Sequence, residues 1–210
     1  IKIKEEHLNE ILFYRMGDFY EMFFDDAITS SSVLDITLTK RGQWNNIDIP
    51  MCGIPFHSAD SYINKLLIKG FKVAICEQVK PNIVFEKKTK GPMERKVVRI
   101  LTPGTILEEN YLKDNRNNFL CSWNEVGGEQ SISWVDLSTG VFFTERLNKN
   151  LASSLETTLD RISPRELIIP YKMKDQKPKF FGECITFQPD SLFNSESCEK
   201  RLKIFYKVNS

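Results

Sequence analysis

The sequence predicts an α/β protein in which two mixed sheets follow one another along the chain. Short apolar runs alternate with segments of helical periodicity through about the first hundred residues. A polar, turn-rich stretch at 103–117 interrupts this pattern and predicts a linker. Beyond it, three closely spaced strands precede further helices and strands, which indicates a mixed sheet. We therefore expect one domain at 1–102 and another at 118–210.

The elements of the first domain have local signals. Residues 11–16 form a short apolar run that Gly17 ends, which is typical of a buried strand. Asp18 is placed to cap a helix over 18–31, where apolar residues recur at helical spacing. Residues 33–40 alternate between apolar and polar side chains, which predicts a half-buried strand.

The rest of the first domain continues the alternation. Residues 42–48 read as a polar loop that carries a tryptophan. Ser58 is expected to open a second helix, and Gly70 to end it. Residues 71–76 and 94–102 then predict two more strands.

The second domain is expected to begin with a meander. Its predicted strands are 119–123, 131–136, 141–144, 166–169 and 184–187. An apolar stripe over 151–162 predicts a helix between the third and fourth of them. Asp190 is expected to cap a last helix that carries Leu202 and Phe205.

The composition is that of a folded protein. With 210 residues, 41% of them hydrophobic and 27% charged, the chain can form two cores. The net charge is only +1, so a polyanionic partner would have to meet a local patch. No run of 18 apolar residues occurs and no signal peptide opens the chain, so we expect a cytoplasmic protein with no membrane partner.

Cysteine usage predicts no metal site and no disulfide framework. Only two histidines accompany the five cysteines, and no C-x-x-C spacing occurs, so reduced and mostly buried thiols are expected. The chain begins with Ile1 and stops at Ser210 without an ending signal. We expect it to be part of a longer protein.

Phe19 and Glu21 are the most informative pair. One interpretation is local, because Asp18-x-x-Glu21 matches a capping box that would place Phe19 in a first helical turn. The other is that Phe19 is a surplus aromatic at an exposed corner, where stacking on a base is worth roughly 1–3 kcal/mol. Glu21 would then accept a hydrogen bond from the edge of the base. Wedging open a duplex costs least where its pairing is already defective, so this reading points to mispaired DNA.

Two further segments are rich in positively charged residues. The stretch 80–99, called here the basic segment, holds seven cations against two acids, and Lys40 and Arg41 add a pair. These residues are either a solvated surface or contacts that position a phosphate backbone. Residues 80–92 within it predict a loop.

Asp136 ends a predicted strand, where a ribonuclease H-like nuclease would hold Mg²⁺. No convincing set of partner carboxylates accompanies it, so a strand-ending turn is favoured. No phosphate-loop, zinc-protease or serine-hydrolase motif occurs in the chain.

Five ordered blocks of the sequence resemble the MutS family of bacterial DNA mismatch-recognition proteins. The blocks lie at 13–23, 34–42, 49–57, 73–78 and 91–99. The first contains the run Gly17-Asp18-Phe19-Tyr20-Glu21. The match is dense from 11 to about 109, and the remainder resembles the second domain of the family more loosely.

The resemblance implies a mismatch-recognition domain followed by an incomplete ribonuclease H-like connector domain without nuclease activity. It implies recognition of mispaired or unpaired bases in double-stranded DNA as the first step of mismatch repair. The Phe-x-Glu pair of the family falls on Phe19, which would stack on the mispaired base from the minor groove, and on Glu21, which would hydrogen-bond it. Supporting DNA contacts would fall on Arg41, Met51 and Arg95.

The resemblance also implies partners and cofactors. In full-length family members a separate ATPase region binds ATP and Mg, the protein forms a homodimer, and the connector domain contacts the repair protein MutL. For this chain we expect DNA binding without catalysis and no cofactor of its own. A nuclease centred on Asp136 and a protein-docking module in the second half are the alternatives.

The sequence departs from the usual family pattern at a few positions. Met22, Cys52 and Phe56 stand where Leu, Ala and Tyr are usual, and these changes are conservative. Lys80-Pro81-Asn82 replaces a more acidic turn, which leaves the DNA contacts of that loop open.

Overall fold

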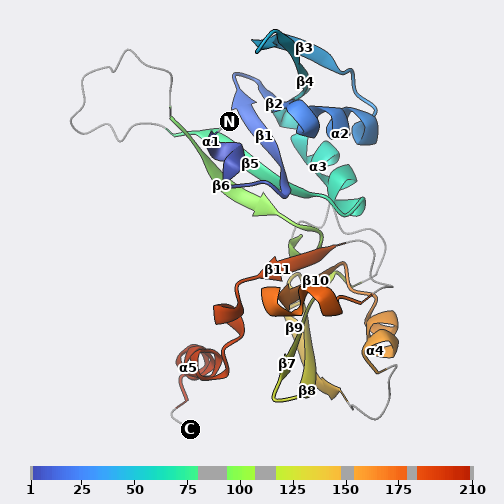
Figure 1. The fold of residues 1–210 in the computed structure, drawn as a ribbon, viewed down its shortest axis with the longest axis vertical. Coiled ribbons are helices and arrows are strands. Elements are labelled where there is room, and N and C mark those ends of the chain that lie inside the picture. Colours follow the sequence, from blue (N-terminus) through green and yellow to red (C-terminus); the bar gives the residue numbers. More distant parts are fainter. Residues whose placement is uncertain (1, 80–93, 107–116, 148–153, 179–183, 209–210) are drawn as a thin grey trace, which may run out of the picture. The chain divides into compact units, whose positions relative to one another are not determined.

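The computed structural model describes residues 2–79, 94–106, 117–147, 154–178 and 184–208 (Figure 1). Contacts between Cα atoms divide the chain into two compact units, Ile1–Pro103 and Gly104–Ser210. Each unit contains a mixed sheet with helices, so the predicted α/β class is confirmed.

The first unit is built on a six-stranded sheet in the order β3-β4-β2-β1-β5-β6. Its strands are β1 (Glu10–Met16), β2 (Phe19–Phe23), β3 (Thr39–Trp44), β4 (Ile47–Pro55), β5 (Lys72–Gln78) and β6 (Arg95–Leu101). Its helices are α1 (Lys2–Glu5), α2 (Phe24–Leu34) and α3 (Ala59–Ile68). β1 and β5 run parallel, whereas the other neighbours are antiparallel.

One face of this sheet forms the core with α2 and α3. Alternate residues of the central strands point to this face, because side chains in a strand alternate between its two sides. The buried apolar residues of the strands include Ile11, Phe13, Tyr20, Met22, Cys52, Ile54, Val73 and Ile75. Cys52 Sγ lies 3.5 Å from the Ala27 carbonyl oxygen of α2, which places this face under the helix.

The predicted helix at 18–31 is wrong over residues 18–23. Residues 19–23 are the strand β2, and α2 begins at Phe24. Gly17, with φ of 58°, makes a two-residue turn with Asp18 that returns the chain antiparallel to β1. Asp18 therefore caps no helix, and the capping-box interpretation of Glu21 is also wrong. The physical reason is that burial of Tyr20 and Met22 follows the period of a strand.

The predicted strand at 33–40 and loop at 42–48 are also corrected. Residues 33 and 34 end α2, and β3 starts only at Thr39. The polar stretch is a β-hairpin whose turn is Asn45-Asn46, both with positive φ. Asparagine tolerates this conformation, and such a turn matches the twist of paired strands. β3 is mostly polar, which suits a strand that is exposed along its whole length.

The other predicted elements of the first unit are confirmed within a few residues. α3 follows Ser58 and ends before Gly70, which has φ of 84°. β5 and β6 occupy the two strands predicted next. The loop expected at 80–92 lies outside the described residues.

The second unit has a five-stranded sheet in the order β11-β10-β7-β8-β9. Its strands are β7 (Phe119–Val126), β8 (Glu129–Asp136), β9 (Val141–Leu147), β10 (Glu166–Pro170) and β11 (Ile185–Gln188). Its helices are α4 (Ser154–Ile162) and α5 (Ser195–Tyr206). β7 to β9 form an antiparallel meander, and β10 and β11 add parallel strands beside β7. This is the ribonuclease H-like arrangement that the resemblance predicted.

The core of the second unit lies between the sheet and α4. It contains Cys121, Trp123, Ile132, Trp134, Leu147, Leu159, Ile162, Leu167, Ile169 and Met173. The expected thiols are confirmed, because no disulfide joins the five cysteines and four of them are buried. Leu151, expected on the helix stripe, lies outside the part of the chain that the structure describes.

Two details near the ends of the second unit differ from expectation. Asp190 caps no helix. It begins a 3-10 turn and accepts a hydrogen bond from the Lys172 amide. The cap of α5 is Asn194, whose side chain accepts from the Ser197 amide at 2.9 Å. The start of the expected linker at 103–117 is also packed, since Gly104 is buried and its amide donates to the Glu166 carboxylate.

Asp136 is a buried carboxylate that organises the turn after β8. It is 2% exposed and accepts hydrogen bonds from the Asn118 amide at 3.1 Å and from the Ser138 amide at 2.9 Å. The Ser138 hydroxyl donates a third at 2.6 Å. Burial alone would raise the pKa of Asp136, but these hydrogen bonds outweigh it and hold the pKa below its usual value.

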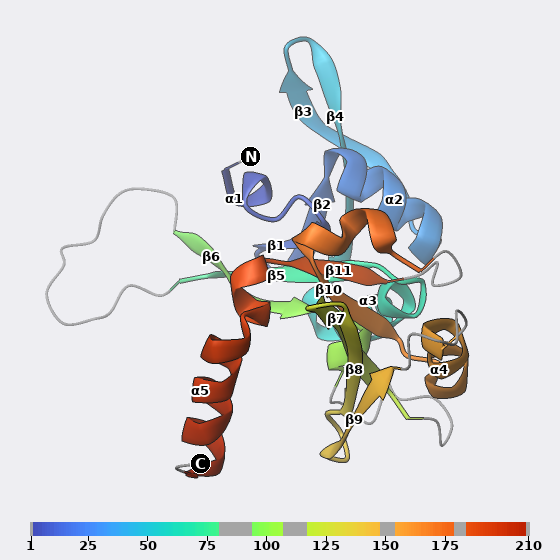
Figure 2. The same ribbon diagram turned by 60° about the horizontal axis from the view of Figure 1, so that its bottom comes forward.

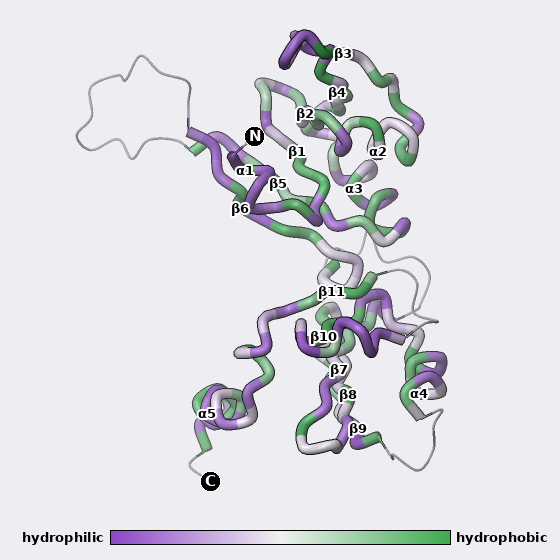
Figure 3. Tube along the Cα trace, in the orientation of Figure 1, coloured by the Kyte–Doolittle hydropathy of each residue, from purple (hydrophilic) through white to green (hydrophobic). Residues whose placement is uncertain are grey.

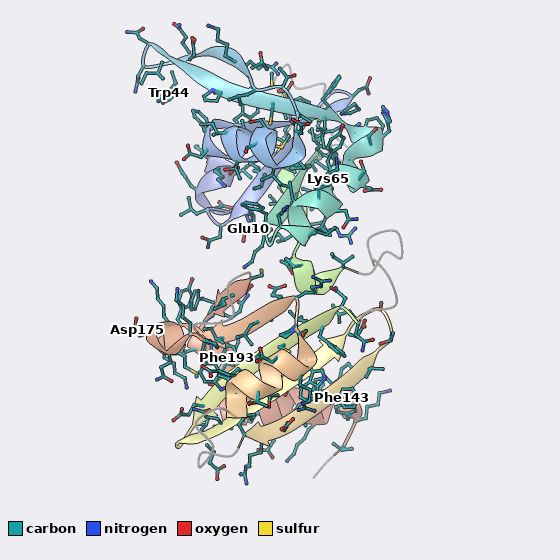
Figure 4. All side chains as sticks on the ribbon, turned by 90° about the vertical axis from the view of Figure 1, so that its right-hand side faces the viewer. Glu10, Trp44, Lys65, Phe143, Asp175 and Phe193 are labelled. Carbon is teal, nitrogen blue, oxygen red and sulfur yellow. The ribbon has the colours of Figure 1, made fainter. Side chains whose placement is uncertain are left out.

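Replacing Asp136 by Asn should therefore destabilise the fold. An amide nitrogen cannot accept from these donors, and an unsatisfied buried donor costs about 1–3 kcal/mol. Urea unfolding monitored by circular dichroism measures the loss. Asp175→Asn is the matched control, because Asp175 is exposed in the same unit (Figure 4). Equal stability of the two variants would contradict the structural role of Asp136.

Tyr20 gives the first unit a pH dependence. Its hydroxyl donates to Glu77 Oε1, and burial, followed by that carboxylate, raises the pKa of Tyr20 from 10.0 to about 12. Between these values the tyrosine ionises in the unfolded chain but not in the folded one. Stability is therefore full below pH 10 and falls as the pH rises toward 12. The urea midpoint across this range should fall more steeply for the wild type than for Tyr20→Phe, and parallel curves would exclude Tyr20 as the cause.

Candidate nucleic-acid interface

β2 places Phe19 and Glu21 on the same face of the first sheet. The two residues are two positions apart in a strand, so their side chains point away from buried Tyr20 and Met22. The Phe19 side chain is 48% exposed. Its ring is therefore not enclosed by its own protein and is available to a ligand.

Strand register brings further residues to this face. Tyr14 and Met16 of β1 lie directly opposite Glu21 and Phe19. On the other side of β2, Gly53 and Met51 of β4 lie opposite Glu21 and Phe23. Directly opposed residues project to the same side of a sheet. We call this surface the open face, and it comprises Tyr14, Met16, Phe19, Glu21, Phe23, Met51, Gly53 and Pro55.

Arg41 covers the Glu21 carboxylate. It lies in the irregular part of β3, where the pairing register shifts between Lys40 and Gln43. The Arg41 guanidinium donates to both Glu21 oxygens, at 2.6 Å to Oε1. The Glu21 side chain is only 13% exposed, whereas that of Arg41 is 49% exposed. The pair is therefore open to solvent on the arginine side, where the guanidinium is accessible to a ligand.

The hairpin that carries Arg41 extends beyond the rest of the first sheet (Figure 2). β3 is hydrophilic along its length (Figure 3), and Trp44 marks its outer end (Figure 4). Lys40 is ion-paired with Asp48 at 2.7 Å, so its charge is locally compensated. The hairpin thus offers polar and cationic groups beside the open face.

Arg95 reaches the same side of the sheet from β6. Its Nε donates to the Arg15 carbonyl oxygen at 3.1 Å, and its guanidinium lies 5.0 Å from the centre of the Tyr14 ring. Tyr14 in turn lies opposite Glu21. A guanidinium at this distance from an aromatic face is held by a cation–π interaction.

The structure therefore gathers the five residues that the sequence nominated. Phe19, Glu21 and Met51 share the open face, and Arg41 and Arg95 are connected to it through Glu21 and Tyr14. Of the basic segment, residues 80–93 lie outside the described residues. Lys96 in the described part is ion-paired with Glu94 at 3.3 Å.

Sequence reasoning missed Tyr14 and Gly53. Tyr14 belongs to the first matched block, and Gly53 to the third. Their place beside Glu21 follows from strand register, which could not be used while 18–31 was interpreted as a helix. An alternating reading of 19–23 would have shown that Phe19 and Glu21 share a face.

Phe19 and Glu21 lie outside a large hollow of the first unit. This hollow of about 850 Å³ adjoins the open face, lined by α1 and by residues that include Leu12, Tyr14 and Phe23. Phe19 and Glu21 do not line it, and the Phe19 side chain is exposed.

No group of three or more His, Cys, Asp or Glu residues in the described ranges is arranged to hold a metal ion. No helix in the described part of the chain has the length and apolarity needed to span a membrane.

Two family models match the chain. The model for MutS domain I matches residues 1–110, and the model for MutS domain II matches residues 118–210. The first match contains the whole open face, and the second contains the ribonuclease H-like sheet. The two domains occur in the order that the resemblance predicted. The chain therefore belongs to the MutS family, whose domains I and II connect it with DNA mismatch repair and DNA recognition.

Proposed function

We propose that the chain recognises mispaired or unpaired bases in double-stranded DNA by stacking Phe19 on the base while Glu21 accepts a hydrogen bond from it. The observation that carries the proposal is an exposed aromatic ring beside a carboxylate on one strand face. Arg41, Met51 and Arg95 would support the DNA around this pair.

The spacing of the pair suits a single base. Residues two apart in a strand are separated by about 6–7 Å along the chain. A ring that stacks on the face of a base leaves the edge of that base within reach of a group at this distance. Phe19 would supply affinity without regard to sequence, because every base has an aromatic face. Glu21 would orient the base, since it accepts a hydrogen bond only from a donor on the edge of that base.

The energies explain selectivity for defective pairing. Stacking on Phe19 returns roughly 1–3 kcal/mol, whereas unstacking a base step costs a few kcal/mol. In a fully paired duplex the two nearly cancel. At a mispaired or unpaired base the defect lowers the free energy needed for unstacking, so insertion of the Phe19 ring becomes favourable there.

Arg41 resolves the electrostatic problem of a carboxylate near phosphates. In the free protein it neutralises Glu21. On DNA the guanidinium can turn to a phosphate while Glu21 turns to the base, so that each group exchanges one polar partner for another. The Glu21 carboxylate thus loses its arginine partner only where a base donates a hydrogen bond to it.

We propose that the chain binds DNA without cleaving it. The carboxylate of Asp136 is engaged by the turn of its own strand, which supports a structural role. ATP and Mg binding, and homodimerisation, are assigned by the family resemblance to regions of longer family members and are proposed on that basis alone.

A second role in protein contact is favoured by α5. This helix leaves Leu202, Ile204, Phe205 and Tyr206 each more than half exposed. A cluster of exposed apolar side chains is typical of an interaction surface. We propose that domain II contributes such contacts, for which MutL is the partner that the family implies.

Phe19→Ala tests the wedge. In the full-length protein it should reduce the preference for a duplex with one G·T mismatch over its paired counterpart by roughly 5- to 150-fold, the equivalent of the lost stacking energy. Fluorescence anisotropy with the two labelled duplexes measures the preference. Phe142→Ala is the matched control, because Phe142 is 58% exposed on the second sheet. An unchanged preference in Phe19→Ala would refute the wedge.

Glu21→Ala separates selectivity from affinity. It should lower the preference for the mismatch while leaving or raising affinity for paired DNA, because a negative charge is removed from the vicinity of the phosphates. The same anisotropy assay measures both. Asp48→Ala removes a carboxylate from the β3–β4 hairpin, where its partner is Lys40, so it should leave the preference unchanged. A clear drop in paired-DNA binding by Glu21→Ala would contradict the assigned role.

A further inference from the structure

We propose that Gly53 is a specificity-determining residue, because its missing side chain keeps open the space between Phe19 and Glu21 into which the base fits. This inference rests on the proposed function and adds a third residue to Phe19 and Glu21. Gly53 neither stacks nor hydrogen-bonds through a side chain. Its contribution is to let the base approach the strand.

The geometry places this glycine between the two functional side chains. Gly53 is exposed and lies directly opposite Glu21 in the β2–β4 ladder. A Cβ atom added to Gly53 would lie 3.7 Å from Glu21 Cγ and 4.0 Å from Phe19 Cδ1. Any side chain at this position would therefore stand beside both groups and occupy the surface between them.

The backbone does not require glycine here. Gly17, Gly42 and other glycines of the chain have φ in the left-handed region, where a side chain is strained. Gly53 is not among them and lies within the regular strand β4. Its conformation is open to any residue.

Packing does not require glycine either. The nearest atom to an added Cβ would be the Tyr20 carbonyl oxygen at 3.5 Å, an ordinary van der Waals distance. Gly104 shows the contrast, because a Cβ there would lie 2.8 Å from Glu166 Cβ and force its neighbours to move. A methyl group would fit at Gly53 and not at Gly104.

Glycine at this position weakens the strand. It loses more backbone entropy on folding than other residues and offers no side chain to pack across the ladder. A strand glycine that neither the backbone nor the neighbours demand is typical of a place where a ligand approaches closely. The ligand class follows from the flanking groups, since an aromatic ring and a carboxylate suit a planar base with a donor on its edge.

The test is a graded series, Gly53→Ala and Gly53→Val, in the full-length protein. Both variants should have a Tm equal to or above that of the wild type, since the methyl fits and valine favours strands. Affinity for the G·T duplex should fall progressively, reaching about tenfold for valine, within the range of one lost base stack. Affinity for paired DNA should stay the same. A structural role for Gly53 would produce the opposite pattern, with a lowered Tm and a uniform loss of binding.

Two controls show whether a side chain at position 53 blocks the base or the backbone of the DNA. Ser131→Val places the same side chain at an exposed strand position of the second sheet and should change neither affinity. A duplex with an abasic site presents no base to the space, so its affinity should not change in the Gly53 variants. If abasic and mismatched duplexes lose affinity equally, the side chain obstructs the backbone of the DNA and the inference is overturned.

The series also separates this inference from the proposed function. If the wild type and Phe19→Ala discriminate equally, the wedge itself fails. If Phe19→Ala loses discrimination while Gly53→Val retains that of the wild type, the wedge stands and the role of Gly53 is refuted. Should Gly53→Val fail to fold, Gly53→Ala decides, because its methyl is accommodated at ordinary contact distances.

Discussion

The hydrogen-bonded pairing of β2 with β1 on one side and β4 on the other is the constraint on which the recognition surface depends. With both edges occupied, β2 cannot shift alone. A slip of one residue would turn Phe19 and Glu21 toward the core and expose Tyr20 and Met22 to solvent. Burial of those two core side chains therefore holds the wedge pair outward. Core stability and site geometry are two consequences of one register.

Charges on β2 and on the β3–β4 hairpin are arranged in compensated pairs. Arg41 neutralises Glu21, and Lys40 is paired with Asp48 on the hairpin. The Lys40–Asp48 pair is exposed on both sides and therefore weak, whereas Glu21 is the shielded partner of Arg41. In the proposed mode of binding, the stacking and unstacking energies are of similar size. Selectivity would then come from small differences between near-equal terms, so the shape of the space around Phe19 would be decisive.

In the second unit, the fold itself uses an aspartate at the end of a strand. The strand order is ribonuclease H-like, and Asp136 ends the interior strand β8. Its carboxylate accepts hydrogen bonds from Asn118 and Ser138, which close the turn. A shared architecture does not by itself imply a shared chemistry, because function depends on the groups that a site presents. The exposed apolar residues of α5 are the basis of the proposed contact with another protein.

The sequence by itself determined the α/β class, most of the strands that are short apolar runs, and the family, and it nominated Phe19 and Glu21. It did not determine that 19–23 is a strand, because Tyr20, Phe23 and Phe24 satisfy a helical period over so short a window. Only the tertiary structure decided that Gly53 and Tyr14 flank Glu21 and that Arg41 covers it. These relations join residues 7 to 32 positions apart through strand register. Register is fixed by which side chains the whole sheet buries, and no local pattern contains that information.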